Sequence, residues 1–244
     1  MGKTLLITGA SAGIGAATAQ AAARKGYQRV VVNYRQDDAS AHAVAKHIQN
    51  QRCEAVLIKA DISNSSAVTA LFAQISSLTP ATLDLVNNAG TMAPKATIQD
   101  LVPARVSAVF QVNVIGAIDV ARHAVAYMRA HHGGSIVNVS STAARKGMAN
   151  EYIDYAYSKA AIETLGLADE LASESIRVNA VRPGLIETGI HAKGGVPDRI
   201  AQLARTTPLG RAGTPQEVAA AILWLLSDEA SYTTRSILDV AGGR

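Results

Sequence analysis

Short runs of β-branched and other apolar residues alternate with longer alanine-rich stretches along the whole of this 244-residue chain. This alternation is typical of a parallel sheet whose two faces are covered by helices. The runs lack period-two alternation, as expected of strands buried on both faces. Strands are predicted at residues 4–8, 29–33, 55–59, 83–86, 135–139, 176–181 and 237–240. The sequence therefore predicts an α/β fold, a single doubly wound Rossmann domain over residues 1–244 with about seven parallel strands.

Two predicted helices carry clear end signals. The first is predicted over residues 14–25, because Gly26 can adopt the left-handed conformation that follows a helix. The other follows Thr214-Pro215-Gln216-Glu217, which supplies an N-cap hydroxyl, a proline at the first helical position and a capping-box carboxylate. Residues 218–226 form its apolar body, and Trp224 within them is expected to lie in the core.

Residues 187–208 form the segment with the weakest secondary-structure pattern. The segment follows Pro183-Gly184 at the end of a predicted strand and contains Gly194-Gly195 and Pro197. Ligands of doubly wound sheets bind beyond the carboxyl ends of the strands. A long irregular segment at this edge is therefore expected to act as a mobile lid over the substrate.

The composition indicates a globular protein of a reducing compartment. Hydrophobic residues make up 48% of the chain and charged residues 17%, far from the balance of a disordered protein. Cys53 is the only cysteine, so no internal disulfide can form. No secretory leader precedes the first predicted strand, and no apolar run approaches the roughly 20 residues of a membrane span. These features predict a soluble, cytoplasmic protein with no membrane partner.

Nucleic acid and metal binding are not favoured. The net charge is +4, but the basic residues are scattered and aromatic residues make up only 4% of the chain, which leaves little to stack on bases. The six histidines show no spacing that gathers metal ligands on one face, and we expect them at the surface. The chain is therefore predicted to hold no metal.

Three glycines, Gly9, Gly13 and Gly15, follow the first predicted strand and precede a helix. Glycine permits positive φ and close approach of the backbone, and the helix start offers free N–H groups to a pyrophosphate. A merely tight turn needs one glycine rather than three. A nucleoside triphosphate loop is disfavoured because no Gly-Lys-Ser/Thr follows. The turn therefore predicts a dinucleotide site.

Tyr155 and Lys159 lie four residues apart in a predicted helix, so both side chains share one helix face. Of the tyrosines at positions 152–157, only Tyr155 has a lysine at this spacing. A nearby ammonium can lower the pKa of a tyrosine, and a shift from about 10 to about 7 requires roughly 4 kcal/mol. Taken alone, such a pair is more often an ordinary surface pair of a helix.

Motifs in order along nearly the whole chain resemble those of the short-chain dehydrogenase/reductase family. Thr8–Gly15 is similar to the T-G-x-x-x-G-I-G cofactor turn. The chain also has the family's N-N-A-G motif, its helix asparagine, its strand-end serine, its Y-x-x-x-K motif and its P-G-x-x-x-T motif, at Asn87–Gly90, Asn113, Ser141, Tyr155–Lys159 and Pro183–Thr188. Within the family, the chain looks like the branch that includes 3-oxoacyl carrier reductases and glucose dehydrogenases.

The resemblance implies an oxidoreductase that transfers a hydride between a nicotinamide and a small ketone or secondary alcohol. Tyr155 would be the general acid/base, Lys159 would lower its pKa and bind the nicotinamide ribose, Ser141 would hold the substrate oxygen, and Asn113 would hold a water. The family is commonly tetrameric, which implies a homo-oligomer. The rival interpretation is a catalytically silent NADP(H)-binding sensor or scaffold, although such a protein has no need of all four residues.

The cofactor is expected to be NADP(H), with NAD(H) possible. The second predicted strand ends at Asn33-Tyr34-Arg35, where no carboxylate stands to accept the ribose hydroxyls and Arg35 can contact a 2′-phosphate. Asp37 and Asp38 are expected to cap the following helix. The predicted cofactor contacts are Gly9, Ser11, Gly13, Ile14, Gly15, Asn33, Tyr34, Arg35, Asp61, Ile62, Asn88, Ala89, Gly90, Tyr155, Lys159, Pro183, Gly184, Ile186 and Thr188.

Two departures from the family pattern stand out. Thirteen residues commonly separate the family's serine from its tyrosine, a count that falls on Thr142, whereas Ser141 lies fourteen before Tyr155. We take Ser141 as the active hydroxyl and keep Thr142 as the reserve candidate. Thr234-Arg235 stands where relatives commonly have Thr-Gly, which puts the usual local backbone there in doubt.

Overall fold

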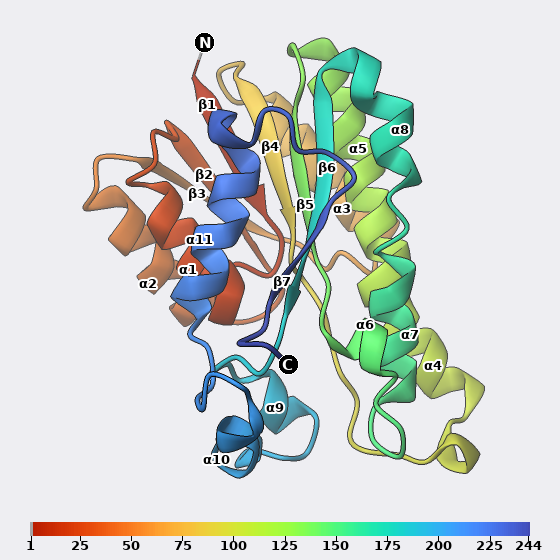
Figure 1. The fold of residues 1–244 in the computed structure, drawn as a ribbon. Coiled ribbons are helices and arrows are strands. Elements are labelled where there is room, and N and C mark those ends of the chain that lie inside the picture. Colours follow the sequence, from red (N-terminus) through yellow and green to blue (C-terminus); the bar gives the residue numbers. More distant parts are fainter. Residues whose placement is uncertain (1) are drawn as a thin grey trace.

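The computed structural model describes residues 2–244, which contain a seven-stranded sheet (Figure 1). The strand order is β3-β2-β1-β4-β5-β6-β7, and each neighbouring pair is parallel. The strands are β1 (Lys3–Ile7), β2 (Arg29–Tyr34), β3 (Glu54–Lys59), β4 (Thr82–Asn87), β5 (Gly134–Val139), β6 (Ile176–Pro183) and β7 (Ile237–Val240). The predicted doubly wound α/β fold is confirmed, and each predicted strand end lies within two residues of the observed one.

Helices cover both faces of the sheet (Figure 1). One face carries α1 (Gly13–Ala22), α2 (Asp38–Gln49) and α11 (Pro215–Leu226), and the other carries α3 (Ser65–Ser76), α5 (Ala117–Ala130) and α8 (Gly166–Leu171). The remaining helices are α4 (Pro103–Phe110), α6 (Ala143–Lys146), α7 (Ile153–Ala161), α9 (Ile190–Lys193) and α10 (Arg199–Leu203).

Each face of the sheet has its own apolar cluster. Leu5 belongs to the cluster under α1 and α11, whereas its neighbour Leu6 belongs to the cluster under α3 and α5. Both side chains are fully buried. Successive side chains of a strand point to opposite faces, so a strand covered on both sides needs apolar residues at every position. This explains the absence of period-two alternation from the sequence.

Helix α1 ends earlier than predicted. It stops at Ala22, three residues before the expected end, and the chain reaches Gly26 through a turn in which Arg24 N donates to Ala21 O and Lys25 N to Ala22 O. Gly26 has the expected positive φ of 84°. The glycine therefore closes a turn rather than the helix itself, a distinction that residue type alone does not make.

Trp224 is 40% exposed, so its predicted place in the core is wrong. Helix α11 directs Val218, Ile222 and Leu225 against the sheet, and all three are buried. Trp224 lies on another side of the same helix. An almost wholly apolar sequence shows no polar stripe, so the sequence could not indicate which face is turned outward.

The helical residues Pro103–Ala130 are continuous and include a π-helical turn at Gln111–Gly116. By length and apolar composition this stretch could cross a membrane. Its α5 part buries Val120, Ala124 and Met128 in the apolar cluster of one sheet face, which is the arrangement of a core helix. A wide turn of this kind often marks a functional position.

The irregular segment predicted at residues 187–208 holds more structure than expected. It contains α9, α10 and a 3₁₀ turn at Ala204–Thr206. These short helices lie beyond the carboxyl ends of the strands (Figure 1). The segment thus lies at the edge of the sheet where a lid is expected, and its role as a lid stays a prediction.

The capping box of α11 provides a test of the helix start. Thr214 Oγ1 accepts a hydrogen bond from Glu217 N, and the Glu217 carboxylate accepts one from Thr214 N at 2.8 Å. We expect Thr214→Ala to lower the free energy of unfolding by about 1 kcal/mol, because the cap oxygen is lost. Urea denaturation would measure this. Thr214→Ser keeps the oxygen and should stay near wild type; an equal loss in both variants would contradict the assignment.

Candidate active site

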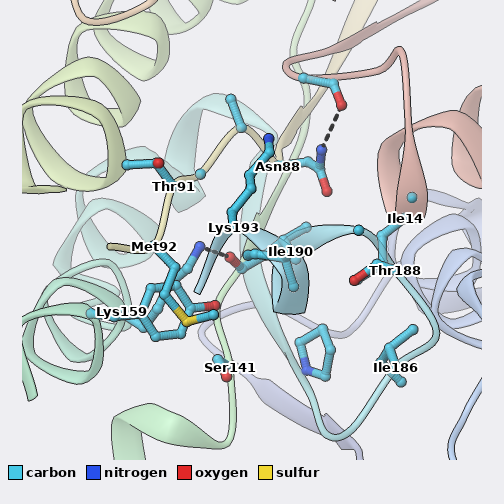
Figure 2. Close-up of a pocket in the computed structure, with 18 of the residues that line it drawn as sticks. Ile14, Asn88, Thr91, Met92, Ser141, Lys159, Ile186, Thr188, Ile190 and Lys193 are labelled. Atoms are coloured by element: carbon cyan, nitrogen blue, oxygen red, sulfur yellow. Dashed lines mark hydrogen bonds between the residues drawn. The ribbon is translucent and has the colours of Figure 1, made fainter. Parts of the chain in front are cut away.

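The carboxyl ends of β1 and β4 are tied together by side chains at the point where the strand order reverses. Thr8 Oγ1 accepts hydrogen bonds from the backbone N–H groups of Asn88 and Ala89, both at 3.0 Å. Asn88 Nδ2 donates in return to Thr8 O at 2.9 Å and to Gly9 O at 3.1 Å (Figure 2). Crevices at such reversal points are where doubly wound sheets bind ligands.

The glycine turn packs directly against this clamp. Gly9 has φ of +64°, and a Cβ there would lie 2.9 Å from Ala89 Cα. A Cβ on Gly15 would lie 2.5 Å from Gly9 O and 2.6 Å from Asn88 Nδ2. Both positions therefore require glycine, because any side chain there would clash with the backbone of the turn or with the Asn88 loop.

The start of α1 is open toward the crevice. Its N-cap residue is Ala12, which makes no side-chain cap, and the first turn contains no acidic residue. The N–H groups at a helix start and its positive dipole end favour an anion. Ala12, Gly13 and Ile14 line the cavity. This uncapped end fits the pyrophosphate of a dinucleotide.

A cavity of about 550 Å³ runs along the carboxyl ends of the strands. Its volume falls in the usual range of about 300–1,000 Å³ for small-molecule sites. Three predicted residues do not line it: Gly15, Tyr34 and Asn113. Predicted residues that do line it are Gly9, Ser11, Gly13, Ile14, Asn33, Arg35, Asp61, Ile62, Asn88, Ala89, Gly90, Ser141, Tyr155, Lys159, Pro183, Gly184, Ile186 and Thr188.

The end of β2 forms one extremity of the cavity. Arg35 is exposed there, and its guanidinium lies 3.8 Å from the Asp61 carboxylate. Asp37 caps α2 by accepting from Ser40 N at 2.9 Å, as predicted. Tyr34 faces away from the cavity, because its side chain is buried and its hydroxyl donates to Asp38 at 2.9 Å.

Asn33 holds the chain beside the glycine turn. Its Nδ2 donates to Ile58 O at 3.3 Å and to Ala60 O at 3.1 Å, and its Oδ1 accepts from Gly9 N at 3.4 Å. The side chain is almost fully buried. Asn33 therefore links β2, the end of β3 and the glycine turn.

Helix α7 turns Tyr155 and Lys159 into the same cavity, as their spacing predicts. Lys159 Nζ lies 5.8 Å from the centroid of the Tyr155 ring and donates to Val139 O at 2.7 Å (Figure 2). The lysine is only 4% exposed. A Cβ on Gly90 would lie 3.3 Å from this ammonium, so Gly90 leaves the space above it open.

The two ionisable groups are strongly affected by burial. Burial raises the pKa of Tyr155 to about 12, against which a hydrogen bond with Ser141 acts. Burial lowers the pKa of Lys159 to about 8, partly offset by the Glu163 carboxylate. The expected lowering of the tyrosine pKa is therefore not present in the free protein, where desolvation outweighs any effect of the ammonium.

Ser141 is the better supported of the two candidates, Ser141 and Thr142, for the hydroxyl that would bind the substrate oxygen. Ser141 Oγ accepts from Ala143 N at 3.1 Å, and the Ser141 hydroxyl lowers the pKa of the Tyr155 phenol against the effect of burial. Thr142 also lines the cavity, but it has no such effect on the pKa of Tyr155. The influence on the phenol favours Ser141.

Asn113 lies outside the cavity in the π-helical turn and is 1% exposed. Its Oδ1 accepts from Thr91 N at 2.7 Å, and its Nδ2 donates to Thr91 O and Ser158 Oγ, both at 2.9 Å. A Cβ on Gly90 would lie 3.5 Å from this Oδ1 and 3.3 Å from Lys159 Nζ. Asn113 therefore lies behind the lysine and fixes the Thr91 backbone.

A group of contacts that the sequence did not indicate joins the segment 187–208 to the start of α7. Arg199 is buried and donates to both carboxylate oxygens of Glu151, at 2.7 and 3.1 Å. It also lies 5.2 Å over the ring of Tyr152, whose hydroxyl donates to Gly194 O at 2.9 Å. Arg199, together with Lys95 at 2.6 Å from the same carboxylate, lowers the pKa of Glu151 to about 2. No spacing along the chain connects residues so far apart.

Other reactive side chains lie apart from this site. Cys53 is buried and its thiol donates to Tyr27 O at 3.2 Å; burial raises its pKa. Within residues 2–244, no group of three or more His, Cys, Asp or Glu side chains is placed to hold a metal ion. His191 is not the surface residue expected, because it lines the cavity with its Nε2 at 2.9 Å from Ile186 O.

Comparisons with known proteins decide the family. A family model described as Enoyl-(Acyl carrier protein) reductase, one of the short-chain dehydrogenase/reductase models, matches residues 9–244. The chain belongs to the short-chain dehydrogenase/reductase family. An uncharacterised oxidoreductase of Escherichia coli is 46% identical over 98% of both chains. The crystal structure of an acetoin dehydrogenase from Salmonella typhimurium superposes with a TM-score of 0.87 at 30% identity, covering 100% of this chain and 97% of the other.

Relatives of this short-chain dehydrogenase/reductase include enzymes with named substrates. A cis-4-hydroxycyclohexanecarboxylate dehydrogenase of Sinomonas cyclohexanicum is 36% identical over 99% of this chain and 96% of its own. An L-rhamnose 1-dehydrogenase (NAD(P)(+)) of a Sphingomonas strain is 36% identical over 99% and 96%. The chain is accordingly an NAD(P)-dependent oxidoreductase of this family, acting on alcohols or ketones.

The buried ammonium gives a pH-dependent stability. The folded state lowers the pKa of Lys159 from 10.5 to about 8, so between these values the unfolded chain binds more protons, and folding stability rises with pH across that window. We expect Lys159→Met to be more stable than wild type at pH 7 by about 3 kcal/mol. The difference should shrink from pH 8 to 10.5. Urea denaturation at pH 7 and 10 checks this; a pH-independent difference would contradict it.

Proposed function

We propose that this protein is an NADP(H)-preferring oxidoreductase that interconverts a ketone and a secondary alcohol, with Tyr155 as the general acid/base. The observation that carries the proposal is that Tyr155, Lys159 and Ser141 all face the cavity that begins at the glycine turn. The uncapped start of α1 fits the pyrophosphate at one part of this cavity. A substrate carbonyl beside Tyr155 would then lie at the opposite part.

The bound nicotinamide would supply or accept the hydride, which the protein's own groups cannot do. Tyr155 donates its phenolic proton to the substrate oxygen during reduction and removes it during oxidation. Ser141, whose hydroxyl lowers the pKa of that phenol, donates to the same oxygen where negative charge develops. Binding of cofactor and substrate excludes water, which strengthens the attraction between the Lys159 ammonium and a phenolate. Lys159 therefore favours the charged form of Tyr155 only in the loaded site.

Proton exchange with solvent would pass behind Lys159. Asn113 Oδ1 lies beside the same Gly90 position as Lys159 Nζ, and it holds the Thr91 backbone on the other side. A water between Asn113 and Lys159 would complete a path for the proton. We assign Asn113 this positioning role, in keeping with its burial in a wide π-helical turn.

The preference for NADP(H) is supported by Arg35. Its guanidinium is exposed at the end of β2 and makes two loose contacts, a hydrogen bond of 3.5 Å to Gln36 Oε1 and a distance of 3.8 Å to the Asp61 carboxylate. A 2′-phosphate would offer it a shorter, bidentate partner. Asp37 is engaged in capping α2, so its carboxylate is not free to accept ribose hydroxyls as an NAD-specific acid would.

The segment 187–208 is proposed as the lid of the substrate end, within one domain that comprises the whole chain. Ile190, His191 and Lys193 of this segment line the cavity opposite α6. The named relatives act on hydroxyl-bearing small molecules, which favours a small alcohol or carbonyl substrate. Val102, just before α4, and Ile115 and Ile118 on the continuous helix that follows are each more than 50% exposed, in keeping with the homo-oligomer common in the family.

Replacing Tyr155 tests the proposal against a silent cofactor-binding protein. Tyr155→Phe should lower kcat on any accepted ketone by about 10²–10⁴-fold, because the proton donor is lost. Binding of NADPH, followed by fluorescence titration, should stay close to wild type. Unchanged turnover would refute the role of Tyr155. Absence of turnover by wild type across a broad carbonyl panel, despite tight NADPH binding, would favour the sensor or scaffold.

Matched variants of the two hydroxyls locate the oxygen-holding group. Ser141→Ala should reduce kcat strongly, whereas Thr142→Val, which keeps the shape of the side chain, should reduce it little. The opposite order would transfer the role to Thr142.

Replacing Arg35 tests the cofactor preference. Arg35→Gln should raise the KM for NADPH about tenfold by removing a charge-assisted contact, and should leave the KM for NADH within about twofold. Initial rates with each cofactor at saturating ketone measure this. Arg24→Gln, at an exposed arginine outside the cavity, is the control. A wild type that prefers NADH, or an equal rise for both cofactors, would contradict the assignment.

A further inference from the structure

The charges that line the cavity are divided between its two ends. The carboxylates among the lining residues are Asp37 and Asp61, and both lie at the β2 end beside Arg35. Around the reacting groups, every other charged lining side chain is basic: Lys146, Lys159, Lys193, Arg199 and Arg244. The substrate end of the cavity is therefore a positively charged pocket.

These cations differ in whether a carboxylate already neutralises them. Arg199 is paired with Glu151 at 2.7 Å. This ion pair neutralises its charge and joins the segment 187–208 to the start of α7. Lys159 has its assigned place beside Tyr155. By contrast, neither Lys146 nor Lys193 makes an ion pair within residues 2–244. These two lysines remain available to a ligand.

Lys146 is crowded by like charge. It ends α6 next to Arg145, whose guanidinium lies 2.9 Å from the Asp239 carboxylate, while the nearby Arg182 is paired with Glu163. Burial and the nearby Arg244 and Arg145 lower the pKa of Lys146. Lys146 therefore lies near other cations with no carboxylate paired to its own ammonium in the described residues, and a bound anion would relieve this repulsion.

Lys193 faces the same cavity from the other wall. It ends α9 in the segment 187–208, and its side chain extends across the pocket in Figure 2. Helices α6 and α9 lie on either side of the sheet's carboxyl edge (Figure 1). Between them, Met92, Met148 and Tyr152 supply an apolar lining. A ligand with a short carbon chain and a charged end fits this arrangement.

We propose that the substrate of this site is a ketone or secondary alcohol that carries an anionic group, a carboxylate or a phosphate ester, bound by Lys146 with Lys193 as a second cation from the lid. The inference rests on the proposed function, since it places the reacting carbonyl beside Tyr155. The two lysines are not among the groups that react. They select the substrate by its charge and do not take part in the proton transfer.

Matched pairs of substrates that differ in charge test this inference. Initial rates with NADPH are compared for 4-oxopentanoate and its methyl ester, and for dihydroxyacetone phosphate and dihydroxyacetone. We expect kcat/KM to be about tenfold higher for the anion of at least one pair, through KM, and to fall toward the neutral value at high salt. The two pairs distinguish a carboxylate from a phosphate ester. Equal rates within both pairs would overturn the proposal.

Variants of Lys146 assign the effect to this residue. Lys146→Met should remove about tenfold in kcat/KM for the anion and leave the neutral partner and NADPH binding unchanged. Lys146→Arg should retain most of the preference. Lys46→Met, at an exposed lysine outside the cavity, is the control. A Lys146→Met variant that loses activity equally on both members of a pair would contradict a role in charge recognition.

A binding measurement separates failure of this inference from failure of the proposed function. Calorimetry compares pentanoate with pentanamide on the protein loaded with NADP⁺. Tighter binding of pentanoate, lost in Lys146→Met, supports the anion site even if no ketone is turned over. Equal binding of the two, together with turnover of neutral ketones, retains the oxidoreductase and rejects the anionic substrate.

Discussion

The hydrogen bonds between Thr8 and the Asn88-Ala89 loop are the constraint on which the rest of the site depends. They join the ends of β1 and β4, strands that are neighbours in the sheet but lie almost 80 residues apart in the chain. A buried backbone N–H without a partner is costly, so the threonine hydroxyl both satisfies the loop and fixes its position. The glycine turn then packs against that loop with no room for a Cβ at Gly9 or Gly15. The turn and the loop therefore fix each other's position on this side of the crevice.

The fold was largely predictable from the sequence. Its main determinant is the burial of the strands on both faces, and strands of this kind consist of consecutive apolar residues. Leu5 and Leu6 belong to different clusters, and no alternative to a covered sheet explains such a run. The predictions that were wrong concern features that depend on tertiary packing. Helix α1 ends at Ala22 although nothing in its sequence forbids another turn, and Trp224 is exposed because an apolar helix does not reveal which side faces the sheet. The short helices α9 and α10 lie in a segment without a clear pattern of its own.

In the candidate site, too, some features could be predicted from the sequence and others depend on the folded structure. Local spacing places Tyr155 and Lys159 on one helix face, and strand ends bring Ser141 and Asn88 to the same edge. Side-chain direction is not local, however. Tyr34 turns away to Asp38, and Arg199 reaches Glu151 from nearly 50 residues further along the chain. The pKa of Tyr155 in the free protein illustrates the limit best, because its direction is set by burial, a property of the folded molecule.

The surroundings of Lys159 explain how a costly buried cation is useful here. The carboxylate that acts on its pKa, that of Glu163, accepts hydrogen bonds from Arg182 and from Ser140 and makes no ion pair with the ammonium in the described residues. The lysine keeps a contact with Val139 O, which offsets only part of the cost of its burial. Its charge thus has no full partner in the free protein. A phenolate at Tyr155 would supply that partner in the loaded site. The same interaction would then offset the cost of burying the lysine charge and lower the pKa of the tyrosine.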